Sequence, residues 1–291
     1  MAVGKMADKG ISIEKNTYSC ILKECFTQGN GVSAVKVLNL MQSHSTEMKP
    51  NQDDLKLAIG ALCRNNKYER GLWKKALQLI HLAAAAIERG DMDISLGTLH
   101  VDAYNEVLQC METHKRWEDA LDLLEMMEAG SGFHASPNHG TYHRVLNALI
   151  SSSQVDTAAE LLFTLSKERQ DSPTIYLYEI VLSALLDKRQ RNVKWQQAIT
   201  LLDSMHELKI SIPTVMFNKV IAACAKAKQT NAARDLFHKM KAQKVQPDTV
   251  TYNSLISVAA NTGRAKDALT LFRMCNEDTG VDIITYTNTI R

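Results

Sequence analysis

Three histidines, His134, His139 and His143, have the spacing that most directly suggests chemistry, because imidazole is a common metal ligand. His134 and His139 lie in a segment rich in Gly, Ser and Pro, and that segment contains no Cys or acidic residue to complete a ligand set. The sequence therefore predicts no metal site, and no residue pattern in it calls for another cofactor.

Nucleophiles and catalytic carboxylates follow no pattern typical of an enzyme. The six cysteines form no Cys-x-x-Cys pair, and five of them lie in or beside apolar positions of predicted helices, as buried thiols in a reducing compartment do. No Ser, Cys or Asp stands in a nucleophile motif. The clustered carboxylates of nucleases and the zinc signature of deaminases are also missing. We expect neither an enzyme nor a small-molecule substrate.

Positive charge is concentrated in one part of the chain. The whole sequence carries a net charge of only +2, unlike a general nucleic-acid binder. Between Arg189 and Lys244, however, eleven Lys or Arg face three acidic residues, which leaves +8 there and −6 elsewhere. Such a block is either a solvated surface or a place where a polyanion binds.

Apolar periodicity shows which elements must carry these side chains. Two stripes at i, i+3, i+4 and i+7 lie between Gln246 and Asp282: Tyr252, Leu255, Ile256 and Ala259, then Ala268, Leu271, Phe272 and Cys275. Asn261-Thr262-Gly263 separates them with a helix stop, and Pro247-Asp248 precedes them with a helix start. This stretch of about 34 residues is predicted to be a helical hairpin.

The same hairpin recurs along the whole chain. First stripes begin at Tyr18, Leu55, Tyr104, Tyr142, Tyr178, Phe217 and Tyr252, and second stripes at Ala34, Ala76, Ala120, Ala158, Ala198, Ala233 and Ala268. Five of the seven pairs are 16 residues apart. The pairs that begin at Leu55 and Tyr178 are 21 and 20 apart, so insertions are expected in their inner loops.

The motif Val-Thr-Tyr-Asn-x-Leu-Ile from Val250, followed by Gly263, Asp-Ala-Leu-x-Leu-Phe from Asp267 and a Pro-Asp before the repeat, resembles the pentatricopeptide repeat. The tetratricopeptide repeat has the same period, but its Trp and Gly-x-x-Tyr lie in the first helix. The resemblance implies an all-α, right-handed superhelical solenoid of about seven repeats plus a partial eighth. After an N-terminal segment 1–14, the expected repeats are 15–51, 52–100, 101–138, 139–174, 175–214, 215–248 and 249–282, with a partial repeat at 283–291.

The resemblance also implies a site for RNA. In this family the residue after the first-helix Tyr and the last residue before the next repeat contact one base together, and the residue three before the first of these packs on base faces. The expected base-reading pairs are Asn218/Asp248, Asn253/Asp282, Asn105/Asn138 and Ser19/Asn51, and the expected stacking residues are Val215, Val250, Ile284 and Tyr176. Asn with Asp implies uridine, Asn with Asn a pyrimidine, and Ser with Asn adenine.

Three other pairs depart from the family's combinations: Lys56/His100, His143/Thr174 and Glu179/Thr214. Asp53 and Asp102 stand at stacking positions, where they would place negative charge against RNA. These departures keep a second hypothesis open for the first five repeats, a protein–protein scaffold of the tetratricopeptide-like type.

The ends and the apolar runs complete these expectations. Residues 1–14 lack an apolar core and arginine, so neither a secretory signal nor a transit peptide is visible. The longest apolar run, Leu79 to Ile87, is too short to span a membrane. The partial repeat at 283–291 suggests a piece of a longer protein. The resemblance implies sequence-selective binding of single-stranded RNA in a plastid or mitochondrion, in RNA processing, stability or translation.

Overall fold

A computed structural model describes residues 14–44, 50–64, 74–80, 82, 101–129, 136–168, 173–187 and 193–290. The regular elements among these residues are α-helices, and none of them is a strand. The chain divides into two compact units, Met1–Ser153 and Gln154–Arg291. The predicted all-α repeat fold is therefore confirmed.

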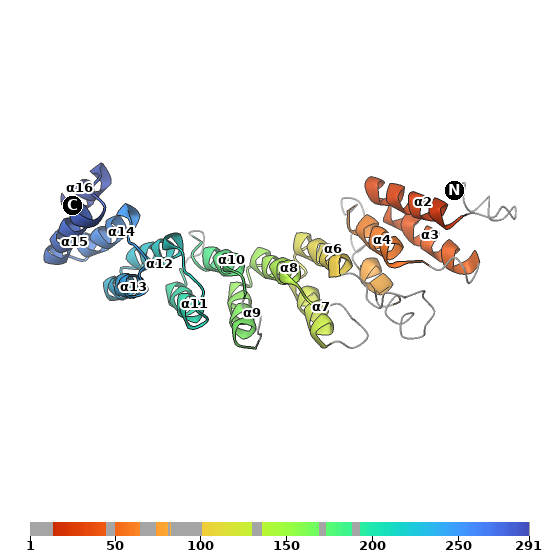
Figure 1. Ribbon diagram of the computed structural model, residues 1–291, viewed down its shortest axis with the longest axis horizontal. Coiled ribbons are helices and arrows are strands. Elements are labelled where there is room, and N and C mark those ends of the chain that lie inside the picture. Colours follow the sequence, from red (N-terminus) through yellow and green to blue (C-terminus); the bar gives the residue numbers. More distant parts are fainter. Residues whose placement is uncertain are drawn as a thin grey trace. The chain divides into compact units, whose positions relative to one another are not determined.

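The first unit is a stack of helical hairpins (Figure 1). Its helices are α2 (Lys15–Gln28), α3 (Gly31–His44), α4 (Gln52–Arg64), α6 (Val101–Thr113), α7 (Trp117–Ala129) and α8 (His139–Ser151), and residues 74–80 are also helical. The first helices pack on one another in the order α2, α4, α6, α8. The second helices α3 and α7 lie against them. Each first helix thus contacts the first helix of the next repeat.

The second unit repeats this arrangement. Its helices are α9 (Val155–Glu168), α10 (Ile175–Leu185), α11 (Trp195–Glu207), α12 (Thr214–Lys226), α13 (Thr230–Ala242), α14 (Thr249–Asn261), α15 (Ala265–Asp278) and α16 (Ile283–Ile290). The first helices α10, α12, α14 and α16 pack in series, with the second helices alongside. Helix α16 is the first helix of the predicted partial repeat.

The predicted stripes form the core. The anchors Tyr18, Tyr104, Tyr178, Phe217 and Tyr252 are among the largest fully buried side chains of the described chain. The second stripes each begin with a buried Ala, and such a small side chain lets two helices approach closely. Large rings on first helices and Ala on second helices therefore fix how each hairpin closes.

Backbone hydrogen bonds end the first helices. Gly263 adopts a φ of 72°, its N–H donates to the Ala260 carbonyl, and the N–H of Arg264 donates to the Ala259 carbonyl. Lys228 holds the equivalent position after α12 with a φ of 56°. The predicted stop at Gly263 is confirmed, and at Lys228 the same turn forms although a side chain disfavours it.

The insertions expected after Leu55 and Tyr178 fall largely on residues outside the described ranges. No helix in the described part of the chain is long and apolar enough to cross a membrane.

Candidate nucleic-acid interface

The predicted base-reading residues lie in the second turn of the first helices, and we call each of them a reader. The second member of each pair is the N-cap of the next first helix, and we call it the cap residue. Asp248, the cap residue of α14, has an extended backbone, and its side chain accepts from the Thr251 N–H at 2.8 Å. The Asp248 N–H donates to Thr251 Oγ1 at 3.1 Å. This reciprocal capping box fixes the carboxylate at the start of the helix.

Asn218 on α12 is held by both residues of that box. Its Nδ2 donates to the two carboxylate oxygens of Asp248 at 2.9 and 3.0 Å, and its Oδ1 accepts from Thr251 Oγ1 at 2.6 Å. Asn218 is 8% exposed and Thr251 is fully buried. Because one end of the amide faces a carboxylate and the other a hydroxyl donor, its orientation is determined.

The pair Asn253/Asp282 has the same layout with longer bonds. Asn253 Nδ2 lies 3.3 and 3.4 Å from the Asp282 carboxylate oxygens. The Thr285 hydroxyl donates to Asp282 Oδ1 at 2.7 Å instead of to the reader. As a result, the buried Asn253 Oδ1 has no hydrogen-bond partner. This second amide is held less firmly than that of Asn218.

In the first unit, Asn105 and Asn138 meet in the same way. Asn105 Nδ2 lies 3.4 Å from Asn138 Oδ1, and the Thr141 hydroxyl donates to Asn105 Oδ1 at 2.8 Å. Asn138 caps α8 through the Thr141 N–H at 3.0 Å. The stacking position of this repeat is Asp102, which pairs with Lys56, and that of the next repeat is Gly140. A Cβ at Gly140 would stand 3.2 Å from Asn138 Oδ1.

Ser19 and Asn51 are brought together through a third residue, Asp54. Ser19 Oγ donates to Asp54 Oδ1 at 2.7 Å, and Asn51 Oδ1 accepts from the Asp54 N–H at 2.8 Å. Asp54 is 1% exposed. The hydroxyl proton of Ser19 is used in this contact, so Ser19 offers a ligand only acceptor lone pairs.

The predicted stacking residues lie in the first turns of α10, α12, α14 and α16, two residues after each cap position. Tyr176, Val215, Val250 and Ile284 are 51%, 57%, 58% and 60% exposed. Most side chains of the first stripes are buried, whereas these four lie outside the stripes, at equivalent positions of their helices, and are exposed. They are available to contact a flat apolar ligand.

Two of the three departing readers, Lys56 and Glu179, form ion pairs. Lys56 Nζ lies 2.9 Å from Asp102 Oδ2 on the next first helix, and Lys219 Nζ lies 3.0 Å from Glu179 Oε1. His100 lies outside the described ranges. The assignment of Thr214 as the partner of Glu179 is wrong by one residue, because α12 begins at Thr214 and its N-cap is Pro213. The loop before α12 has no Asp or Asn to fix that register.

The basic block is partly neutralised by acidic side chains. Four of its lysines pair with carboxylates, Lys194 with Asp156, Lys219 with Glu179, Lys239 with Asp203 and Lys241 with Asp278. The exposed Lys209, Lys226, Lys228 and Lys244 have no ion-pair partner among the described residues. Arg189 and Arg191 lie outside the described ranges. The positive charge available to bind an anion is thus smaller than the +8 counted from the sequence between Arg189 and Lys244.

The cap carboxylates have perturbed acidities. Burial raises the pKa of Asp248, but the bonds from the Thr251 N–H and hydroxyl and from the Asn218 amide outweigh burial, and the pKa is lowered overall. The pKa of Asp282 is also lowered, chiefly by the Thr285 hydroxyl. Both carboxylates therefore stay ionised and act only as acceptors at neutral pH.

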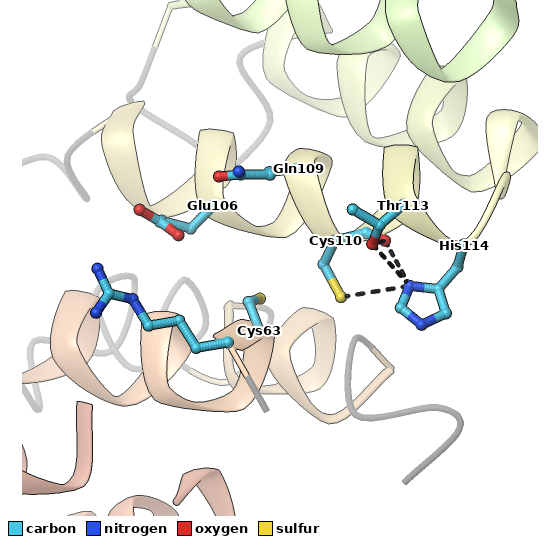
Figure 2. A pocket seen from close by; sticks show the side chains of 7 residues that line it. Cys63, Glu106, Gln109, Cys110, Thr113 and His114 are labelled. Carbon is cyan, nitrogen blue, oxygen red and sulfur yellow. Dashed lines mark hydrogen bonds between the residues drawn. The ribbon is translucent and has the colours of Figure 1, made fainter. Parts of the chain in front are cut away.

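A separate pocket of about 620 Å³ lies between α4 and α6 and contains Cys63, Cys110 and His114 (Figure 2). His114 Nδ1 lies 2.7 Å from the Cys110 carbonyl and 3.9 Å from Cys110 Sγ. The pKa of Cys63 is raised by its hydrogen bond to Cys110 and by burial. A thiol that holds its proton is a poor nucleophile and a poor metal ligand.

No group of three His, Cys, Asp or Glu side chains within the described ranges is arranged to hold a metal ion. His134 lies outside these ranges. His143 Nε2 lies 3.1 Å from Asn147 Nδ2 on the same helix.

Family profiles match both ends of the chain. The profile described as the pentatricopeptide repeat domain matches residues 2–61, the PPR repeat family matches 213–261, and the PPR repeat matches 250–278. The last two cover Asn218, Asp248 and Asn253. The chain belongs to the pentatricopeptide repeat family.

Curated relatives of this pentatricopeptide repeat chain come from Arabidopsis thaliana. A chloroplastic pentatricopeptide repeat-containing protein is 28% identical over 165 residues, which is 56% of this chain and 32% of the relative. A mitochondrial one is 31% identical over 99 residues, or 34% of this chain and 17% of the relative. The chain thus spans about a third of the length of the first relative and less than a fifth of the length of the second.

Solved structures of a pentatricopeptide repeat protein are also similar. The crystal structure of PPR10 from maize is 18% identical, with 99% of this chain and 42% of that chain covered and a TM-score of 0.47. PPR10 in complex with an 18-nucleotide psaJ RNA element is likewise 18% identical, with 99% and 39% covered and a TM-score of 0.49.

The structure adds functional candidates to this pentatricopeptide repeat chain that sequence reasoning missed. Thr141, Thr251 and Thr285 each lie three residues after a cap residue, and Thr141 and Thr251 donate to a reader on the preceding first helix. Asp54 takes that position beside Ser19. The signal was present as Asn/Asp-x-x-Thr, a form of capping box. Its link to the preceding repeat was not visible in a linear pattern.

Proposed function

We propose that this pentatricopeptide repeat array binds single-stranded RNA along the surface formed by its first helices, with one base at each reader and cap pair. The observation that carries this proposal is the Asn218 amide, which Asp248 and Thr251 orient beside exposed Val215 and Val250. A fixed amide and an acceptor next to apolar side chains suit the edge and faces of one unstacked base.

The pair Asn218/Asp248 fits uracil best. Uracil offers an N3–H donor between two carbonyl acceptors, and the ionised Asp248 can accept from that N–H while the second Asn218 Nδ2 proton donates to a carbonyl. Cytosine has a lone pair at N3, which would face the carboxylate. The same chemistry at Asn253/Asp282, between Val250 and Ile284, gives two neighbouring uridines.

The first unit supports other choices. In Asn138 an amide replaces the carboxylate, and its Oδ1 already accepts from Thr141, so its Nδ2 can donate to N3 of cytosine. Asn105/Asn138 therefore accepts a pyrimidine without the strict uracil preference. Ser19/Asn51, with Ser19 as an acceptor, fits the amino group of adenine.

A protein-binding role in the first unit is the second candidate. The Lys56–Asp102 ion pair occupies a reader position and the stacking position of the next repeat, where a base would otherwise lie. Exposed Asp53 adds negative charge on the same helix. A peptide with both signs of charge suits this surface better than RNA does.

The names of the relatives support a place in a plastid or mitochondrion. There the array would act by binding alone, covering or remodelling a transcript segment during processing, stabilisation or translation. No bond is made or broken in this mechanism.

The test is binding to a uridine decamer at increasing salt, followed by fluorescence anisotropy. RNA binding predicts that log K falls linearly with log salt, with a slope of about −0.7 for each phosphate contact. Asn218→Ala should weaken the complex by roughly tenfold, the size of one base contact. Asn276→Ala, an exposed Asn on α15, should leave it unchanged. Absence of binding at low salt, or equal effects of the two variants, would refute the proposal.

A further inference from the structure

Three threonines in the first turns of first helices form capping boxes, and two of them make a contact that helix capping does not require. Thr141, Thr251 and Thr285 follow their cap residues by three positions, and each is fully buried. A capping box needs only the exchange between the cap residue and the third residue of its own helix. In two of these three boxes the Thr hydroxyl also reaches the preceding first helix.

The residue at this position varies with the reader along the chain. The readers Asn105, Asn218 and Asn253 are each followed, one repeat later, by a Thr. The readers Lys56, His143 and Glu179 are followed at the equivalent third helical position by Ala103, Leu177 and Met216. The hydroxyl is therefore present where the reader is an amide. Asp54 holds the position after the hydroxyl reader Ser19, and an apolar side chain follows the other three readers.

The hydrogen bonds around Thr251 form a closed circuit. The Asp248 N–H donates to Thr251 Oγ1, and Asn218 Nδ2 donates back to the Asp248 carboxylate. Thr251 Oγ1 lies 2.6 Å from Asn218 Oδ1 and 2.9 Å from Asp248 Oδ1, and the shorter contact is the better place for its single proton. The hydroxyl thus assigns the oxygen end of the amide. Only the second Nδ2 proton and remaining lone pairs are left for a ligand.

Thr285 forms its capping box without contacting the reader before it. Its hydroxyl donates to Asp282, Asn253 Oδ1 has no partner, and the Asn253–Asp282 distances are longer, at 3.3 and 3.4 Å. The Thr285 hydroxyl therefore does not reach the reader, and the reader lies farther from its cap residue than Asn218 does. This repeat shows the Asn amide without the third contact that Thr251 makes with Asn218.

We infer that Thr141 and Thr251 are positioning residues that hold the neighbouring Asn amide in the orientation that meets the base, and so influence base preference without touching RNA. This inference rests on the proposed RNA binding. Without the hydroxyl, the Asn218 amide is held by Asp248 alone and its Oδ1 loses its donor. The orientation that offers an Nδ2 proton to a uracil carbonyl is then less firmly fixed, which weakens the preference for uridine over cytidine.

The test compares Thr251→Val, which keeps the shape of the side chain but removes the hydroxyl, with Thr251→Ser, which keeps the hydroxyl. Affinities for a uridine decamer and a cytidine decamer are measured, since homopolymers need no knowledge of register. Thr251→Val should lower the uridine-to-cytidine ratio by about fivefold, as expected for one neutral hydrogen bond. Thr251→Ser should restore most of that ratio. The control is Thr200→Val, the same substitution at an exposed position of α11.

The outcomes separate this inference from the proposed function. If Thr251→Val weakens binding of both decamers equally, or only lowers the melting temperature, the threonine is a helix cap and the inference is wrong while RNA binding stands. A wild-type protein that binds neither decamer overturns the proposed function and the inference with it. A changed ratio that Ser restores supports both.

Discussion

At the scale of single residues, Asp248 joins two tasks that are usually separate. It caps α14, where a carboxylate also suits the positive end of the helix dipole, and it orients the Asn218 amide of the preceding repeat. The helix start and the proposed base recognition therefore depend on one side chain. A change at Asp248 or Thr251 affects both, whereas a change at Asn218 leaves the capping box in place.

The lowered pKa of Asp248 gives a prediction for pH. The folded state favours the carboxylate, so its contribution to stability is complete above the unfolded pKa of about 3.9 and is lost as pH falls through the lower folded value. We expect the ratio of the affinities for the uridine and cytidine decamers to be constant from about pH 8 to pH 5. Anisotropy at both pH values measures it, with Asp248→Asn as a variant whose ratio is already low. A ratio lost between pH 7 and pH 5 would contradict the assigned role.

The sequence located the readers and caps because their spacing is tied to the repeat. Asn218 and Asp248 could be predicted as a pair since each stands at a fixed offset from a buried ring. Thr251 could not, because the partner of a hydroxyl depends on the distance between two helices. The Lys56–Asp102 contact joins residues 46 positions apart and likewise follows from packing.

At the scale of helices, a buried stripe fixes where every reader points. Leu255 on α14 and Leu236 on α13 are 3% and 1% exposed. The stripes were predictable because helical periodicity requires one apolar side. The start of α12 was not predictable to the residue, because the Ile-Pro-Thr segment before it contains no Asp or Asn cap. Either Pro213 or Thr214 could therefore be the residue before the helix.

Leu255→Ala should therefore lower the free energy of unfolding by about 2–5 kcal/mol, as truncation of a buried leucine leaves a cavity. Leu269→Ala, on the exposed side of α15, should change it by less than about 0.5 kcal/mol. Denaturant titrations of both variants provide the comparison. Equal effects would mean that the first-helix stripe does not form the core.

At the scale of the whole molecule, the two units differ in which side chains occupy the reader, cap and stacking positions. The second unit holds the two Asn/Asp pairs, the exposed Val215, Val250 and Ile284, and the basic block. The first unit has one amide pair and an ion pair at a reader position. Charge and apolar exposure together favour RNA contact in the second unit. Neither property could be assigned from net charge alone.

The measurement that tests base recognition most directly is a change of specificity at one reader. Asn253→Thr replaces an amide by a shorter hydroxyl side chain next to Asp282, and this change leaves room for a purine. The Asp282 carboxylate can accept hydrogen bonds from the N1–H and the amino group of guanine. In the family this combination selects guanine. The control is Asn276→Thr on the second helix α15.

The probes are uridine decamers in which one guanosine is moved along the strand, in competition with the unsubstituted decamer. We predict that wild type disfavours guanosine throughout its footprint, whereas Asn253→Thr favours it at one position by roughly 1–3 kcal/mol, the size of one base contact. Equal affinity for all of these RNAs in both proteins would contradict base recognition and favour a protein-binding scaffold instead.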